Sequence, residues 1–321
     1  MSDGPPALQP RRAWSLRGDR ALIRRRNRAA LWPLALAVLM LVIQRVVRTA
    51  PDLVTPLGLA ATLSLAYANG ANDVSKAIAT LVGAGVTDYR RAMRWGVLWT
   101  VSGAALSAVA ARALVVTFSA GFLARGVHIG PAAALAIVLG ALGWVLLATR
   151  TGLPVSTTHA LTGAIVGVGA MSSGVGGVAW SKLAQKIAWP LAASPLLAVV
   201  LGLAALALVR AVPGQAPLTP LHWLSSGAAG LARGLNDAPK IVALGAGFAV
   251  ATGHGAVPLW LVLAVAVAMG AGSWAGGRRV TQTLAERVTR LDDREGLGAN
   301  LATALVRSPS APAPTRPGRS G

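Results

Sequence analysis

The sequence predicts an all-α membrane protein, a polytopic transmembrane helical bundle that contains re-entrant or broken helices. Three observations predict this class: an apolar composition, five long apolar runs, and a polar motif that occurs twice inside apolar sequence. Of the 321 residues, 54% are hydrophobic and only 12% are charged. Such a composition leaves too little polar surface to cover a water-soluble domain.

Five apolar runs each approach the ~20 residues that a helix needs to cross the hydrocarbon core of a bilayer. A buried helix of a soluble protein would explain any one of them. Five in one chain leave no soluble exterior to bury them, so we interpret the runs as membrane spans. They are Ala29–Val47, Gly96–Val116, Ala132–Ala148, Ile187–Val209 and Ala256–Trp274.

The formal net charge is +20, and a dense group of arginines precedes the first predicted span. Basic residues beside a span favour the cytoplasmic side, so we expect a multi-pass protein of the cell membrane with a cytoplasmic N-terminus. No folded domain or interleaved aromatic side chains accompany the arginines, so contact with anionic membrane lipid is a simpler interpretation than nucleic acid binding. The arginines are Arg11, Arg12, Arg17, Arg20, Arg24, Arg25, Arg26 and Arg28.

The predicted organisation has four parts. Residues 1–28 form a basic disordered tail, and residues 29–277 form the transmembrane body. Residues 278–306 carry apolar positions at roughly helical spacing among charges, which predicts an amphipathic helix at the membrane surface or in the cytosol. Residues 307–321, rich in proline and arginine, are predicted to be disordered.

The body contains an internal repeat. Gly70–Lys76 aligns with Gly234–Lys240 at a constant offset of 164 residues, and Asn, Asp and Lys, all rare in this chain, recur in register. Transport proteins are often built from two related halves. We therefore place repeat 1 at about 53–172 and the start of repeat 2 at about residue 222.

Asp73 and Asp237 are the only acidic residues inside long apolar stretches. A charge at membrane depth costs at least ~2.5 to 3.5 kcal/mol, so such a group faces a cavity, pairs with an opposite charge or coordinates an ion. Lys76 and Lys240 follow three positions later and could simply neutralise the carboxylates. The flanking glycines and Pro239 favour instead an interrupted helix or re-entrant hairpin around a polar site.

Such a site would suit two kinds of ion. The positive N-terminal ends of half-helices favour anions, whereas the oxygens of Asp73, Asp237 and their neighbours Asn72 and Asn236 favour a coupling cation. Lys76 and Lys240 would add positive charge for the anion. The sequence therefore predicts a combined anion and cation site.

A third polar segment, Gly152–His159, opens another apolar run. Its hydroxyl residues Ser156, Thr157 and Thr158 follow a proline, an arrangement that offers hydrogen-bond donors near a positive helix end and suits the oxygens of phosphate. The alternative is that they only cap the helix. His159 is a candidate proton carrier or a helix-to-helix hydrogen-bond donor, and a proton relay is not favoured. The chain has no catalytic triad, so we do not expect an enzyme.

Three segments resemble signature sequences of the inorganic phosphate transporter (PiT) family: "NGANDVSKAIATLVGAGV", "GLPVSTTHALTGAIVGVG" and "ARGLNDAPKIVALGAG". The resemblance covers most of the chain from Leu53 to Val306. It implies a phosphate symporter driven by sodium or protons, without a further cofactor, with two inverted repeats and a tendency to form a homodimer. It also implies the substrate- and cation-binding residues, with sodium at the Asn and Asp positions: Asn72, Asp73, Ser156, Thr157, Thr158, Asn236 and Asp237.

The chain departs from the family pattern in two places. Ser75 and Lys76 replace Ala-Asn or similar residues, which brings a positive charge near the site and bears on substrate choice or cation stoichiometry. A second PVSTTH-type segment, which the family has beyond the position of Val306, does not follow here. Two other functions therefore stay open: a permease for sulfate or another oxyanion, and a truncated, non-transporting membrane protein that regulates or binds a partner.

Overall fold

The structure is a computed structural model, and it describes residues 50, 53–120, 122–124, 126–127, 129–212, 218–250, 257–288 and 291–306. All of them belong to one compact unit, Ala50–Gly321. The predicted basic tail 1–28, the predicted span Ala29–Val47 and the predicted tail 307–321 lie outside the described residues.

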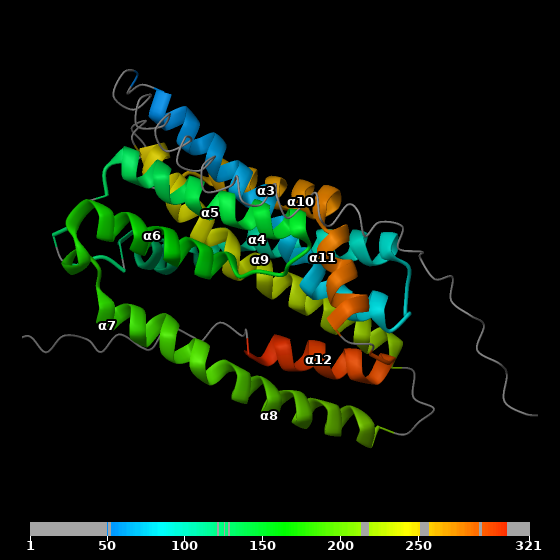
Figure 1. The fold of residues 1–321 in the computed structure, drawn as a ribbon. Coiled ribbons are helices and arrows are strands. Elements are labelled where there is room, and N and C mark those ends of the chain that lie inside the picture. The colour runs from blue at the N-terminus through cyan, green and yellow to red at the C-terminus, as the bar shows by residue number, and fades with distance from the viewer. Residues whose placement is uncertain are drawn as a thin grey trace, which may run out of the picture. The chain divides into compact units, whose positions relative to one another are not determined.

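The described residues form helices and no β-sheet, which confirms the all-α prediction; one isolated β-bridge joins Leu123 and Val178. Most of the helices lie side by side in an elongated bundle (Figure 1). In chain order the elements are α3 (Val54–Gly83), α4 (Tyr89–Ala120), α5 (Pro131–Thr151), α6 (Thr157–Ser173), η2 (Val175–Gly177), α7 (Trp180–Leu183), η3 (Ala184–Ala188), α8 (Trp189–Ala211), α9 (Thr219–Val250), α10 (Leu259–Gly276), α11 (Arg278–Gln282), η4 (Thr283–Val288) and α12 (Asp293–Val306).

Three helical segments in the described part of the chain are long and apolar enough to cross a membrane, by length and composition. They are Pro131–Thr151, Trp180–Ala211 and Leu259–Gly276, and each overlaps one predicted span. A fourth predicted span, Gly96–Val116, lies within α4. Their length and composition suit a membrane protein.

The two helices that carry the repeated motif, α3 and α9, pack against each other and run in opposite directions. The Ser226 hydroxyl, near the start of α9, donates a hydrogen bond to the Ala77 carbonyl near the end of α3, at 2.9 Å. At the other end, the ring of Phe248 lies against Gly58. Opposite directions are what an inverted repeat requires, and the inverted repeat itself stays a prediction.

The prediction that the helix breaks at the repeated motif is wrong, because α3 and α9 are each continuous through it. The glycines serve close packing instead. A Cβ atom added to Gly70 would lie 1.9 Å from the Met269 carbonyl oxygen of α10, and one added to Gly234 would lie 2.3 Å from the Thr100 carbonyl oxygen of α4. Small residues let membrane helices approach to backbone contact, so these glycines bring helices together rather than ending them.

The break in the helical body lies between α5 and α6, which form a helical hairpin. Gly152 ends α5 with a left-handed backbone conformation (φ 78°) that favours glycine. The Leu153 amide then bonds to the Ala148 carbonyl at 2.8 Å, and the chain reverses into α6 within a few residues. The α5–α6 hairpin thus lies at the hydroxyl-rich segment and not at the repeated motif.

The segment 278–306, predicted as an amphipathic helix, consists of α11, the π-helical η4 and α12. α12 packs against α8 and α9, and η4 packs against α3. At the start of α12, Asp293 accepts from Thr219 at 3.1 Å and lies 2.6 Å from the Nδ1 atom of the buried His222. Its position at a membrane surface stays a prediction.

Candidate functional site

A polar cavity of about 280 Å³ lies where α3, α9 and the loop entering α6 meet. The repeated motif contributes from both helices, and the hydroxyl segment contributes from the hairpin. All the predicted binding residues except Asn72 line it. The lining residues are Asp73, Lys76, Pro154, Val155, Ser156, Thr157, Thr158, Asn236 and Asp237.

Each carboxylate of the cavity pairs with the lysine one turn further along its own helix. Asp73 pairs with Lys76, and Asp237 lies 3.3 Å from the Nζ atom of Lys240. These pairs match the alternative in which each lysine neutralises the carboxylate on its own helix. Both lysines also reach the hairpin: Lys76 donates to the Val155 carbonyl, and Lys240 donates to the Thr158 hydroxyl at 2.7 Å.

Arg233 is a site residue that the motif search missed. Its Nη1 atom lies 3.8 Å from Asp73 Oδ2, and its side chain is 6% exposed. In the described residues around the cavity, three cationic side chains thus accompany two carboxylates, which leaves an excess of positive charge. An arginine inside an apolar stretch was the available signal, because a buried charge is costly unless it has a function or a partner.

The three hydroxyl residues have different partners. The Ser156 oxygen caps α6 by accepting from the His159 amide at 3.3 Å, as the capping alternative expected. The Thr157 hydroxyl instead accepts from the Asn69 amide at 2.8 Å, and the Thr158 hydroxyl accepts from Lys240. A hydroxyl that accepts a hydrogen bond keeps its own proton for a second oxygen. The two threonines can therefore donate to an oxyanion at the positive end of α6.

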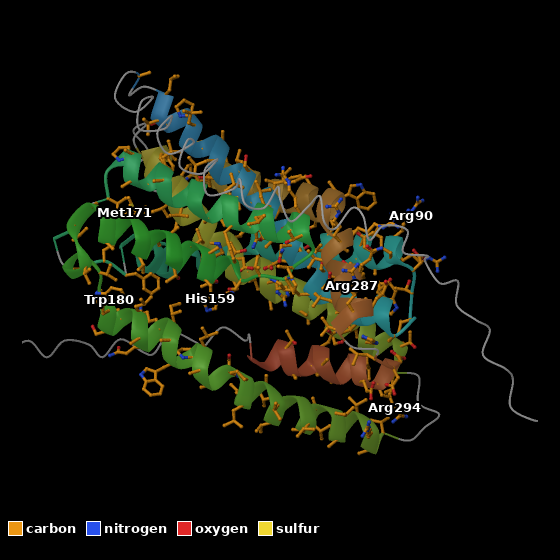
Figure 2. All side chains as sticks on the ribbon, viewed as in Figure 1. Arg90, His159, Met171, Trp180, Arg287 and Arg294 are labelled. Carbon is orange, nitrogen blue, oxygen red and sulfur yellow. The ribbon has the colours of Figure 1, made fainter. Side chains whose placement is uncertain are left out.

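Asn72 is fully buried and does not line the cavity. Its amide nitrogen donates to the Thr149 hydroxyl at 3.1 Å and to the Leu153 carbonyl at 2.9 Å, and its oxygen accepts from the Val155 amide at 3.0 Å. Asn72 thus holds the hairpin loop against α3. His159 is exposed and lies outside the cavity lining; Figure 2 labels it on α6.

The described residues contain no group of three or more His, Cys, Asp and Glu side chains that could hold a metal ion. The predicted sodium ligands are instead two carboxylates and two amides. Asp73, Asp237 and Asn236 line the cavity, and Asn72 lies behind the loop. Asn236 donates to Asp237 at 3.2 Å, so its amide orients that carboxylate.

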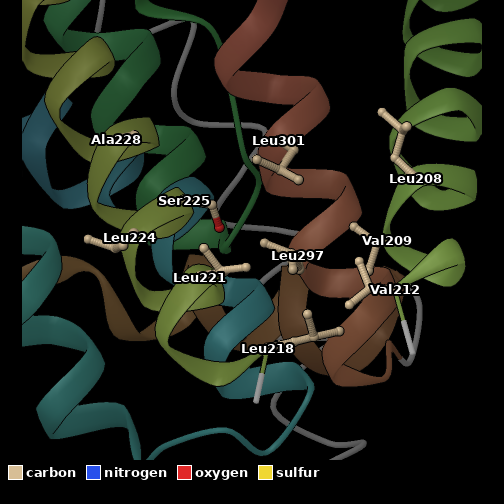
Figure 3. Close-up of a pocket in the computed structure, with 10 residues that line it drawn as sticks. All are labelled: Leu208, Val209, Val212, Leu218, Leu221, Leu224, Ser225, Ala228, Leu297 and Leu301. Carbon is tan, nitrogen blue, oxygen red and sulfur yellow. The ribbon is translucent and has the colours of Figure 1, made fainter. Parts of the chain in front are cut away.

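A larger cavity of about 420 Å³ lies between α8, α9 and α12 (Figure 3). Leucine, valine and alanine side chains line it, together with Ser225. It contains no charged group that would recognise an ion. The polar cavity at Asp73 and Asp237 is therefore the candidate functional site.

Apolar helices around a buried, charged and hydroxyl-lined cavity are typical of a helical membrane protein, and the cavity is a candidate ion site. The chain belongs to the phosphate transporter family, whose model matches residues 69–218 and 214–308. This is a family of transporters rather than enzymes.

Individual relatives agree with this assignment. A probable low-affinity inorganic phosphate transporter of Mycobacterium bovis is 32% identical over 260 residues, which is 76% of this chain and 60% of the relative. One of Rhizobium meliloti is 27% identical and covers 77% of this chain and 76% of its own length. This chain thus spans about 60% of the length of the mycobacterial relatives.

A solved structure described as "The sodium-dependent phosphate transporter" shares the fold. Its TM-score is 0.67 at 19% sequence identity, and the match covers 79% of this chain and 84% of that one. At this identity the likeness concerns the fold.

Proposed function

We propose that this chain transports inorganic phosphate across the membrane. The observation that carries the proposal is the polar cavity: two carboxylates, Lys76 and the N-terminus of α6 line it, and Arg233 and Lys240 pair with those carboxylates from beside it. Phosphate carries negative charge and several acceptor oxygens. It therefore suits a site with an excess of positive charge and with Thr157 and Thr158 as donors.

Coupling to a cation gradient completes the proposed activity. Sodium and protons are the two candidates, and the structural neighbour is described as sodium-dependent. Sulfate and other tetrahedral oxyanions share the charge and shape of phosphate, so a permease for such an ion is the competing function. A chain that binds phosphate without moving it would be the regulatory alternative.

The charge distribution supports an orientation in the membrane. Arg90, Arg287 and Arg294 lie toward one end of the bundle, and Met171 and Trp180 lie toward the other (Figure 2). The basic end is the one that the positive-inside bias places in the cytoplasm. We propose a multi-pass protein of the cell membrane with this end, and the N-terminus, on the cytoplasmic side, and we keep the homodimer as a prediction.

The test is uptake of labelled phosphate into proteoliposomes that contain the purified full-length chain, under imposed sodium or proton gradients. We expect gradient-driven uptake that excess sulfate does not abolish. Asp73→Asn should abolish uptake while membrane insertion persists, because Lys76 and Arg233 lose their shared carboxylate. Asp88→Asn is the matched control, because Asp88 is exposed and outside the cavity. Unchanged uptake by Asp73→Asn would contradict the role of the cavity, and binding without uptake would favour the regulatory alternative.

A further inference from the structure

Lys76 and Lys240 have similar oxygen partners at the polar cavity: Lys76 lines the cavity, and Lys240 contacts Asp237 and Thr158, which line it. The Lys76 ammonium contacts one carboxylate oxygen of Asp73 and the carbonyl oxygen of Val155. The Lys240 ammonium contacts a carboxylate oxygen of Asp237 at 3.3 Å and the Thr158 hydroxyl oxygen at 2.7 Å. Each ammonium therefore contacts at least one charged and one neutral oxygen.

These partners are the ligands that a hard metal cation takes in a protein. Carboxylate, carbonyl and hydroxyl oxygens replace the hydration shell of such an ion. An ammonium group carries the same single positive charge as sodium, and it is tethered to the helix that carries the carboxylate. Because Lys76 and Lys240 each follow their aspartate by three residues, both members of each pair lie on the same helix face.

Both lysine side chains are largely buried, with exposed fractions of 16% for Lys76 and 6% for Lys240. A charge in such a position needs a partner, and each lysine finds one on its own helix and a second on the hairpin. The pairs neutralise Asp73 and Asp237 within the chain. A sodium ion at either carboxylate would have to displace a tethered ammonium first.

We infer that the ammonium groups of Lys76 and Lys240 take the place of coupling metal cations at Asp73 and Asp237, so that this chain binds its oxyanion without sodium. The inference rests on the proposed phosphate function. It assigns to the lysines a role that free cations would otherwise fill, namely neutralising the carboxylates so that a second negative ion can enter.

The test compares phosphate binding to the purified full-length protein in sodium chloride and in choline chloride at equal ionic strength, by isothermal titration calorimetry with inorganic phosphate. For the unmodified protein we expect dissociation constants that agree within about twofold, because an affinity that does not depend on sodium implies no linked sodium binding. This comparison requires no variant, so it remains decisive if a substitution prevents folding.

Lys76→Met provides the second arm, since methionine keeps an unbranched chain and removes the charge. In choline we expect phosphate to bind at least about tenfold more weakly, a loss of about 1.4 kcal/mol. Sodium should restore most of the affinity, because the vacated oxygens of Asp73 and Val155 can then hold the free cation. The control is Lys186→Met, whose exposed side chain lies outside the cavity and should behave like the unmodified protein.

The outcomes separate the inference from the function on which it rests. Phosphate binding by the unmodified protein only in sodium would overturn the inference and leave the transport proposal standing. A loss in Lys76→Met that sodium does not restore would also overturn it, since the ammonium would then serve as a phosphate ligand and not as a cation substitute. Absence of phosphate binding in both salts would contradict the proposed function itself.

Discussion

Replacing Gly234 with alanine tests whether α9 and α4 pack backbone against backbone. The added Cβ would lie 2.3 Å from the Thr100 carbonyl oxygen and 2.6 Å from the Ala104 amide nitrogen. Both atoms belong to the backbone of α4, so neither can swing aside as a flexible side chain would. Since such contacts are essentially never closer than 3.0 Å, the two helices must separate by about 0.7 Å.

The magnitude follows from two opposing contributions. Overpacking a well-packed interior costs about 1 to 3 kcal/mol. Alanine also favours the helix over glycine by about 1 kcal/mol. Gly247→Ala isolates the first contribution, because Gly247 lies on the same helix, is exposed and has no described atom within 4 Å of its added Cβ. The helix propensity gain is common to both variants and cancels in their difference.

We therefore expect Gly234→Ala to be less stable than Gly247→Ala by about 1 to 3 kcal/mol in the free energy of unfolding. The assay is a denaturant titration of both purified proteins in the same detergent, followed by tryptophan fluorescence and by circular dichroism. Phosphate affinity should fall in Gly234→Ala as well, because Asn236 and Asp237 lie on the displaced part of α9. Equal stability of the two variants would refute the close approach of α9 and α4.

Two further predictions concern the loop and a helix start. Asn72→Ala should release the hairpin loop, because it removes the hydrogen bonds to Leu153 and Val155 at 2.9 and 3.0 Å. We expect faster amide hydrogen exchange in the loop and a loss of about 1 to 3 kcal/mol in the free energy of unfolding. Unchanged exchange would contradict the role of Asn72 in holding the loop. The Arg91 amide, at 3.0 Å from the Asp88 carboxylate, lowers the pKa of that carboxyl at the start of α4. The stabilisation of the folded protein by the ionised Asp88 carboxylate should be fully present above the unfolded pKa of about 3.9 and should be lost as the pH falls through the folded pKa. The difference in unfolding free energy between the unmodified protein and Asp88→Asn should therefore change in that acid range. A difference that stays constant with pH would contradict the prediction.

Much of the site could be predicted from the sequence because its residues are unusual for their surroundings. Asp73 and Asp237 are charged groups in apolar runs, and their repetition with Lys76 and Lys240 pointed to one location. The hydroxyl segment before α6 was found from its composition. Arg233 and Asn69 occupy the same position in the two copies of the motif but differ in residue type, so a comparison that looked for recurring residues passed over both. The role of Asn69 also depends on its bond to Thr157, a residue far along the chain.

The glycines were misinterpreted for a related reason. In a single sequence, Gly70 and Gly234 are compatible both with a broken helix and with close packing. The choice depends on the backbone of another helix, Met269 for the first and Thr100 for the second. The role of Asn72 was equally open, since an amide next to a buried aspartate could bind an ion or could hold a neighbouring loop in place.

The sequence by itself determined the all-α membrane class, three of the apolar helices and the polar segments that build the cavity. These properties are local, because hydropathy, helix length and the cost of a charge in apolar surroundings are set within a turn or a span of the chain. Only the tertiary structure decided which side chains meet. The Asn69 bond to Thr157 and the Lys240 bond to Thr158 join residues 88 and 82 positions apart. Such contacts follow from how helices pack, and helix packing depends on several segments at once.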